Sequence, residues 1–270
     1  MSTPNDLQPP AVPPEKYTRD YFEQWCHGAD EFRTSGGTLL PKRLRIPLDI
    51  ANVQTHHRVL DIGCGRGEVA LHCAQRGALV WSIDYAAAAI ELAEESLAHV
   101  ESSVRTRIKL MQADARALPF DDASMDVAFM LDVVEHLTPP ELDQALQEVW
   151  RVLRPGGILI VHTMPNLWYY AVGYQLYRLV QCIRGVHLPA DPRDRWPFKD
   201  VHVNEQTPLS LWRTLRRNGF ITRVWLQSTQ SYAYESNPIV RLGMETFVRI
   251  PFINLVFCND IFALARKPGV

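Results

Sequence analysis

Short apolar runs alternate with helical patterns along most of the chain. A run of about four to eight apolar residues closed by glycine or polar residues predicts a buried strand, and apolar residues three or four positions apart predict a helix. The predicted strands are 59–62, 79–83, 107–111, 127–131, 158–162, 221–226 and 260–265. The predicted helices between them are 68–75, 86–97, 139–153 and 209–218. Because strands that alternate with helices pair in parallel through right-handed crossovers, we expect an α/β fold with helices on both faces of a mostly parallel sheet.

The segments outside this alternation predict a tail, a lid and two insertions. Five of the first 14 residues are proline, so we expect residues 1–16 to be a disordered tail. The segment 17–56 is expected to form a helical lid, with an aromatic stripe of Tyr17, Tyr21, Phe22 and Trp25 at helical spacing. A second helix is expected over 39–53, with Pro47 as a kink or break. The main domain then covers 57–270. It carries cap insertions at about 164–206 and 228–257.

Composition narrows the class of protein. Among 270 residues, 47% are apolar and 21% charged, and a formal net charge of -2 offers no basic footprint for nucleic acid. The five cysteines match no metal or disulfide spacing, so we expect reduced thiols, no bound metal and a cytoplasmic location. No run of about 20 apolar residues predicts a membrane-spanning helix. We expect a monomer or a homodimer.

The segment Asp61-Ile62-Gly63-Cys64-Gly65-Arg66-Gly67 closes the first predicted strand and opens a helix. Glycines there let the backbone turn sharply and let a ligand approach closely, and the N–H groups at the helix start face that ligand. A dinucleotide fingerprint reads G-x-G-x-x-G, but here the third glycine comes one position early. The carboxylate of Asp61 would repel a pyrophosphate and attract a cationic amino acid. The loop therefore favours a zwitterionic sulfonium ligand.

Two further acids follow the next two strands. Asp84 ends the second predicted strand, about 20 residues after the glycine loop, where this kind of sheet places an acid that binds a ribose. Asp114 follows the third strand and can accept a hydrogen bond from an adenine amine. A Rossmann-type domain that binds another nucleotide, including an oxidoreductase that uses NAD, is the alternative.

At these positions the sequence resembles class I S-adenosylmethionine-dependent methyltransferases of the small-molecule, methyltransferase-11 type. Residues 59–67 resemble motif I, and Leu153-Arg154-Pro155-Gly156-Gly157 resembles the turn before strand five. The resemblance is dense over 57–163. It implies a Rossmann-like, seven-stranded sheet whose last strand runs antiparallel, with S-adenosyl-L-methionine as cofactor. The residues assigned to the cofactor are Asp61, Gly63, Cys64, Gly65, Gly67, Asp84, Tyr85, Asp114, Ala115, Leu131, Asp132 and Tyr21.

The methyl acceptor is less constrained. Asp132-Val133-Val134-Glu135 stands where base and amide N-methyltransferases carry Asn/Asp-Pro-Pro-Tyr/Phe, which disfavours exocyclic base amines. We expect transfer to a small or amphipathic acceptor, with oxygen as the favoured atom. Transfer to nitrogen or carbon, and a regulatory protein that binds the cofactor without turnover, remain alternatives.

Three histidines, together with Glu135, are candidate general bases for an alcohol or phenol. His136 follows the fourth strand, where a structural or cofactor role is the alternative. His162 ends the fifth strand, where ligands bind in open sheets, with a core histidine as the alternative. His202 precedes a helix that begins near Thr207, and a capping network is its alternative.

The two insertions are rich in apolar and aromatic residues over 167–183 and 239–257. An ordinary lid core would explain this composition. The functional alternative is a hydrophobic acceptor channel or a contact with a membrane surface.

Overall fold

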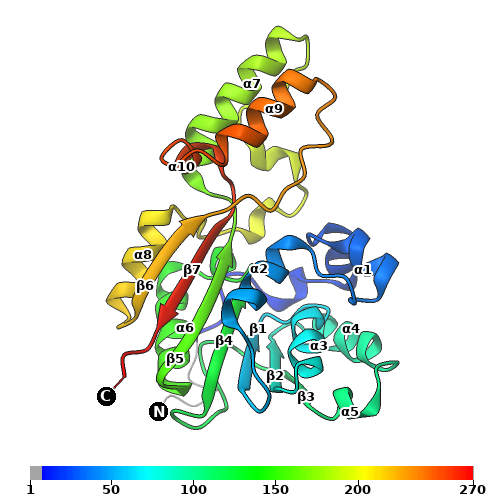
Figure 1. Ribbon diagram of the computed structural model, residues 1–270, viewed down its shortest axis with the longest axis vertical. Helices are drawn as coiled ribbons and strands as arrows, with labels where there is room; N and C mark the ends of the chain where they lie inside the picture. Colours follow the sequence, from blue (N-terminus) through cyan, green and yellow to red (C-terminus); the bar gives the residue numbers. More distant parts are fainter. Residues whose placement is uncertain (1–7, 270) are drawn as a thin grey trace.

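A computed structural model describes residues 8–269 of the chain, and its centre is one seven-stranded sheet (Figure 1). The strand order is β3-β2-β1-β4-β5-β7-β6, with β7 antiparallel to both neighbours and the other pairs parallel. This confirms the predicted sheet and its antiparallel last strand. The strands are β1 Arg58–Ile62, β2 Leu79–Asp84, β3 Ile108–Gln112, β4 Met125–Leu131, β5 Leu153–Thr163, β6 Ile221–Leu226 and β7 Ile261–Arg266.

Helices cover both faces of this sheet. Alternate residues of a strand point to opposite faces, and the core divides accordingly: Leu60 belongs to one hydrophobic cluster and Val59 to the other. The first cluster includes side chains of α6 Pro139–Val152 and α8 Pro208–Arg217, and the second includes those of α2 Lys42–Ala51 and α3 Glu68–Gln75. The remaining helices of the main domain are α4 Ala87–Leu97 and α5 Ser102–Arg105.

The N-terminal segment packs against the main domain. It contains a 3-10 turn at Pro14–Lys16, a π-helical turn at Tyr21–Trp25 and α1 Ala29–Ser35. Residues 1–7 lie outside the described residues, but the predicted tail of 1–16 is wrong for the rest. Val12 is buried against α4, and the Ala11 N–H donates to Glu141 at 2.9 Å. These contacts offset the low apolar content that suggested disorder.

Proline sets the boundary of the second N-terminal helix. α2 begins at Lys42, later than the predicted start at residue 39, because Pro41 takes an extended conformation as its N-cap. The helix continues through Pro47 to Ala51. Pro47 therefore does not break the helix.

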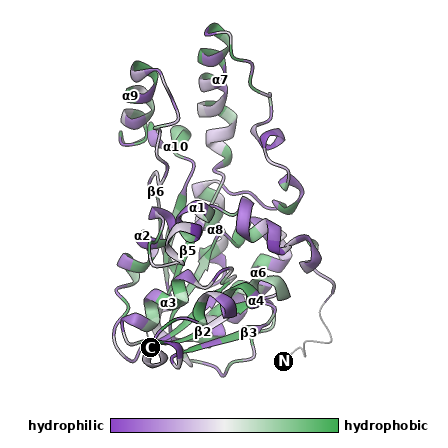
Figure 2. Ribbon diagram, turned by 90° about the vertical axis from the view of Figure 1, so that its right-hand side faces the viewer, coloured by the Kyte–Doolittle hydropathy of each residue, from purple (hydrophilic) through white to green (hydrophobic). Residues whose placement is uncertain are grey.

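The two insertions form one lobe beyond the sheet, which contains α7 Tyr174–Ile183, α9 Pro238–Phe247 and α10 Asn254–Phe257 (Figures 1 and 2). Because β7 runs opposite to both β5 and β6, the segment after β5 and the segment between β6 and β7 leave the sheet at the same end of the strands. At this end lie the carboxyl termini of the parallel strands. Within residues 8–269, no helix is long and apolar enough to cross a membrane.

Candidate functional site

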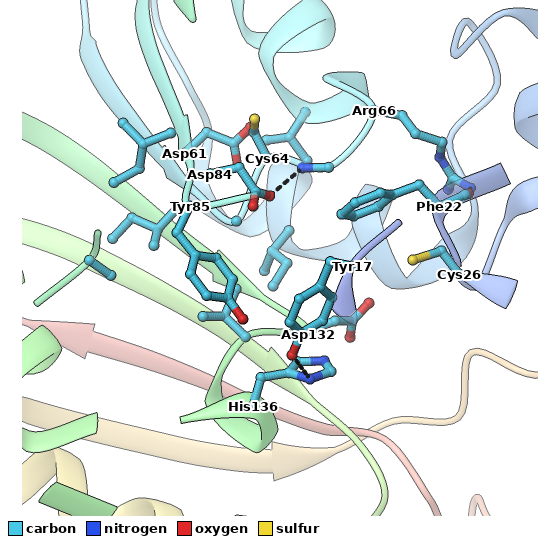
Figure 3. Close-up of a pocket in the computed structure, with 18 of the residues that line it drawn as sticks. Tyr17, Phe22, Cys26, Asp61, Cys64, Arg66, Asp84, Tyr85, Asp132 and His136 are labelled. Atoms are coloured by element: carbon cyan, nitrogen blue, oxygen red, sulfur yellow. Dashed lines mark hydrogen bonds between the residues drawn. The ribbon is translucent and has the colours of Figure 1, made fainter. Parts of the chain in front are cut away.

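A cavity of about 160 Å³ lies at the carboxyl ends of β1, β2 and β4 (Figure 3). Most of the residues predicted for the cofactor line it, although they come from separate loops. These are Asp61, Gly63, Cys64, Gly65, Asp84, Tyr85, Asp114, Ala115, Leu131, Asp132 and Tyr21. The geometry therefore brings together four acids, Asp61, Asp84, Asp114 and Asp132, that lie at or just after the ends of four different strands.

The glycine loop is held against the second strand. The N–H groups of Gly63 and Cys64 both donate to the Ile83 carbonyl, at 2.8 and 3.0 Å. Gly63 and Gly65 have φ angles of 70° and 50°, a region that favours glycine. Gly67 differs from the prediction because it does not line the cavity. A Cβ there would lie 3.3 Å from the Ala93 Cβ, so Gly67 permits close packing of the loop on α4.

The acids at the end of β1 and β2 are buried in the cavity wall. The Asp84 carboxylate accepts hydrogen bonds from the N–H groups of Gly65 at 3.2 Å and Ala86 at 3.0 Å. Asp61 accepts one from the Ser82 hydroxyl at 3.4 Å. Burial raises the pKa of Asp84 to about 6 and that of Asp61 to about 7. Near neutral pH, Asp84 is thus mainly an acceptor for ligand hydroxyl groups.

Asp114 is oriented by a neighbouring arginine. Both of its carboxylate oxygens accept from the Arg116 guanidinium, at distances of 2.7 to 3.0 Å. Arg116 also contacts Glu141 at 3.1 Å. Arginine and carboxylate form a planar bidentate pair that fixes the plane of the acid. Asp114 is therefore presented to the cavity in one orientation.

Aromatic side chains of the N-terminal segment close the cavity. Tyr17, Tyr21 and Phe22 line it, and all three are buried. The Tyr17 hydroxyl lies 2.8 Å from His136 Nδ1, and its ring packs edge-on against Tyr85 at 5.5 Å between centroids (Figure 3). Trp25 is half-exposed and does not line the cavity, unlike the prediction for this stripe of aromatics.

Phe22 and Arg43 also line the cavity, and neither was predicted. Phe22 follows Tyr21 within the aromatic stripe, and this stripe was the only feature of the sequence that could have placed Phe22 at the cavity. Arg43 lies 89 positions before its partner Asp132, and no local pattern links the two.

A chain of charges runs from the cavity into the sheet. Asp132, in a left-handed conformation with φ of 57°, forms ion pairs with buried Arg43 and, at 2.5 Å, with His162 Nδ1. The other nitrogen of His162 lies 3.3 Å from Asp260. Burial opposes ionisation of Asp132, but the charges of Arg43 and His162 hold its pKa well below the ordinary value.

His162 does not face the cavity, contrary to the prediction of a general base. Its side chain is fully buried. Burial alone would lower its pKa, but the Asp132 and Asp260 carboxylates raise it to about 9. A histidine with this pKa already carries its second proton near neutral pH, so it cannot accept another one. His162 instead holds Asp132 in place.

The other two predicted histidines lie side by side. His136 lines the cavity, and its ring centroid is 4.9 Å from that of His202. Burial, together with the charge of His202, lowers the pKa of His136 to about 3, so this imidazole is neutral near pH 7. His202 lies behind it, outside the cavity lining, with Trp196 at 4.5 Å between ring centroids. Figure 3 shows His136 at the side of the cavity near Tyr17.

The sequence is similar to those of known proteins. A family profile described as "Methyltransferase domain" matches residues 60–161. The sterol 4-C-methyltransferase of Caenorhabditis elegans is 36% identical over 39% of this chain and 30% of that protein. The ubiquinone biosynthesis O-methyltransferase of Leptothrix cholodnii is 30% identical over 66% of this chain and 75% of that protein.

A solved structure extends the likeness of fold to nearly the whole chain. The phosphoethanolamine N-methyltransferase 2 of Haemonchus contortus, in complex with S-adenosyl-L-methionine, aligns with a TM-score of 0.62 at 17% identity. The alignment covers 93% of this chain and 60% of that one, and at this identity it shows the fold alone. Three curated relatives are matched over only 30%, 38% and 36% of their own length.

Proposed function

Because this chain belongs to the class I S-adenosylmethionine-dependent methyltransferase family, we propose that it transfers the methyl group of this cofactor to a small or amphipathic acceptor, with oxygen as the receiving atom. The observation that carries the proposal is the convergence of the glycine loop with Asp61, Asp84 and Asp114 on one cavity. In this proposal Asp84 accepts hydrogen bonds from the ribose hydroxyls, Asp114 contacts the adenine amine and Asp61 attracts the amino-acid end.

The reaction is an in-line displacement. A lone pair of the acceptor oxygen forms the new bond to the methyl carbon, and the old carbon–sulfur pair stays on sulfur to give S-adenosylhomocysteine. The acceptor hydroxyl loses its proton. Because the sulfonium is already a good leaving group, alignment and exclusion of water supply much of the acceleration. The buried rings of Tyr17, Tyr21 and Phe22 would exclude water from this cavity.

The acceptor side of the cavity is the side of His136. This neutral imidazole lines the cavity, and His202 packs edge-on against it. We assign the pair to contact with the acceptor. The assignment predicts that His202→Ala lowers turnover and leaves cofactor affinity intact.

The lobe supports an amphipathic acceptor. A second cavity of about 370 Å³ lies between α7 and α9, and apolar side chains such as Leu176, Val180 and Met244 line it. Asn259 also lines this cavity, and the next residue, Asp260, contacts His162. The names of two relatives refer to a sterol and to ubiquinone biosynthesis, which agrees with an apolar acceptor chain.

The same lobe leaves large apolar side chains in solvent. Ile183 of α7 is 80% exposed and Phe252, just before α10, is 84% exposed, with Leu179 and Leu242 more than half exposed. Such side chains beside exposed Arg249 suit the surface of an anionic membrane. We therefore propose a peripheral contact with lipid through the lobe.

Co-sedimentation with phosphatidylglycerol vesicles tests this contact. The wild type is expected to pellet with the vesicles, and the double variant Leu179→Glu, Ile183→Glu is expected to stay in the supernatant. Leu209→Glu, at an exposed leucine outside the lobe, is the matched control and should pellet normally. Equal pelleting of all three proteins would refute the contact.

Calorimetric titration with S-adenosylhomocysteine, with NAD as control, tests the central proposal. Micromolar binding of S-adenosylhomocysteine alone supports it, and binding of NAD alone would replace it with an oxidoreductase. Binding of S-adenosylhomocysteine without turnover on any alcohol or phenol, with or without an apolar chain, would favour a regulatory protein.

A further inference from the structure

Three side chains of the types that bind metal ions lie close together beside the cavity. Glu135 and His136 belong to a 3-10 turn, Val134–His136, and His202 follows a second turn, Lys199–Val201. One ligand atom from each side chain lies within 4.8 Å of the other two. The two segments are also joined through the backbone, because the Glu135 carbonyl accepts from the N–H groups of Val203 at 2.9 Å and Asn204 at 3.0 Å.

We propose that Glu135, His136 and His202 bind a divalent transition-metal ion. The proposal goes beyond the methyl transfer proposed above and depends on it only for the role of the metal toward the acceptor.

The buried position of the Glu135 carboxyl, with no cationic side chain paired to it in the described part of the chain, supports a cation at this place. The residue is 1% exposed, and its Oε2 accepts from the Thr163 hydroxyl at 2.7 Å. No arginine or lysine among residues 8–269 forms an ion pair with it. A buried carboxylate is costly unless a cation or several hydrogen bonds compensate it. A divalent metal ion bound here would compensate the buried carboxylate of Glu135.

The imidazole of His136 is held in the tautomer that a metal ligand needs. Its Nδ1 lies 3.1 Å from the Val201 carbonyl and 2.8 Å from the Tyr17 hydroxyl. A carbonyl can only accept a hydrogen bond, so Nδ1 carries the proton and Nε2 keeps its lone pair. Metal-binding histidines characteristically donate their other N–H to such an oxygen, which fixes the tautomer and the orientation of the ring.

The imidazole of His202 lies near a carboxylate outside the cluster. Its Nδ1 is 3.8 Å from Glu205 Oε1, which is close but longer than a hydrogen bond. Glu205 is fixed in turn by Arg193, at 2.5 Å. Trp196 and His136 pack against the ring. The ring of His202 is therefore held mainly by packing, and the tautomer of His136 is set by the Val201 carbonyl.

The donor set selects the kind of metal. Two imidazole nitrogens and one carboxylate suit Zn²⁺, Mn²⁺ or Fe²⁺ better than Ca²⁺ or Mg²⁺, which prefer oxygen ligands. Three protein ligands also leave coordination positions open, as in sites where a metal binds a substrate. Because His136 lines the cavity, an acceptor oxygen could occupy such a position. The metal would orient that oxygen and lower the pKa of its hydroxyl.

Metal titration of the full chain tests the site. Protein freed of metal with a chelator is titrated calorimetrically with Zn²⁺, Mn²⁺ and Mg²⁺, and separately with S-adenosylhomocysteine. We expect one equivalent of Zn²⁺ or Mn²⁺ to bind in the micromolar range or tighter, and Mg²⁺ to bind far more weakly. His202→Ala should lose at least about 100-fold in metal affinity, because it removes a direct ligand and even changes to the outer partners of ligands cost about 10–100-fold. The same variant should bind S-adenosylhomocysteine normally.

The controls separate the site from folding and from the proposed function. His99→Ala removes an exposed histidine on another surface and should bind metal like the wild type. His202→Gln serves if His202→Ala has an altered melting temperature. Normal S-adenosylhomocysteine binding with no bound Zn²⁺ or Mn²⁺, or unchanged metal affinity in both His202 variants, would overturn the metal site alone. Metal binding without any S-adenosylhomocysteine binding would support the site and overturn the proposed function.

Discussion

Replacing Gly65 with alanine should weaken cofactor binding by more than it weakens the fold. Gly65 has a φ of 50° and lines the cavity, and the nearest atoms to an added Cβ are those of Phe22 at 3.8 Å. The protein itself therefore has room for the methyl group. The space that it would occupy is where the loop lets a ligand approach the backbone.

The cost in stability follows from the backbone conformation. A left-handed conformation costs an alanine about 1–2 kcal/mol relative to its preferred region. Alanine also lowers the conformational entropy of the unfolded chain, and this stabilises the folded protein by about 0.4–1 kcal/mol. The net loss is about 1 kcal/mol, or roughly 2–4 °C in melting temperature for a domain of this size.

Gly36→Ala is the matched control. Gly36 has a φ of 59°, and an added Cβ there would meet nothing within 4 Å. It should lose the same stability as Gly65→Ala. It lies at the end of α1, outside the lining of the cavity. Only Gly65→Ala should also lose affinity for S-adenosylhomocysteine, by at least about tenfold, or 1.4 kcal/mol.

Differential scanning fluorimetry and calorimetric titration measure the two quantities on the same preparations. Equal affinity of the Gly65→Ala and Gly36→Ala proteins for S-adenosylhomocysteine would show that the loop does not contact the ligand. That result would remove the proposed cofactor site.

Three other expectations follow from the same geometry. Asp84→Ala should abolish detectable binding of S-adenosylhomocysteine while the protein stays folded, as judged by its melting curve. Affinity for S-adenosylhomocysteine should fall by at least about fourfold between pH 7.5 and pH 5.5, because Asp84 and Asp61, whose pKa values are raised to about 6 and about 7, both lose charge as the pH falls; constant affinity across this range would contradict the proposed roles of both acids. His162→Gln should destabilise the fold by about 3–5 kcal/mol, since it leaves Asp132 and Asp260 without the cation between them. The stability that His162 supplies is complete below its unfolded pKa of about 6.5 and is lost as the pH rises through about 9, so thermal denaturation of the variant should depend less on pH across that window.

Periodicity predicted the strands and helices well because those patterns are local. The helix at 68–75 and the strand at 221–226 have the predicted bounds. β5 is the exception, since it begins at Leu153 and includes the Arg-Pro-Gly-Gly segment that is typical of a turn. Its pairing with β4 shifts register between Met125 and Val127, and such an irregularity depends on the neighbouring strand.

Most residues that line the cavity could be predicted from the sequence, and the charged network behind it could not. The loop and the acids each follow a strand, so the sheet brings them together by topology alone. The partners of Asp132 are Arg43 and His162, which come from an N-terminal helix and from the neighbouring strand. Whether His162 is a base or a fixed cation depends on Asp260, which lies 98 positions further along the chain. No pattern within a short window contains that information.

The antiparallel last strand has a consequence for how such a protein can diversify. It brings both insertions to one edge of the sheet, while the glycine loop and the acids of the cofactor cavity all lie between residues 61 and 132. Selectivity for a new acceptor could therefore arise by exchange of the two lobe segments alone, while the segment from residue 61 to 132 stays unchanged. A chimera that carries the lobe of a relative would inherit the donor chemistry of this chain and the acceptor range of the other.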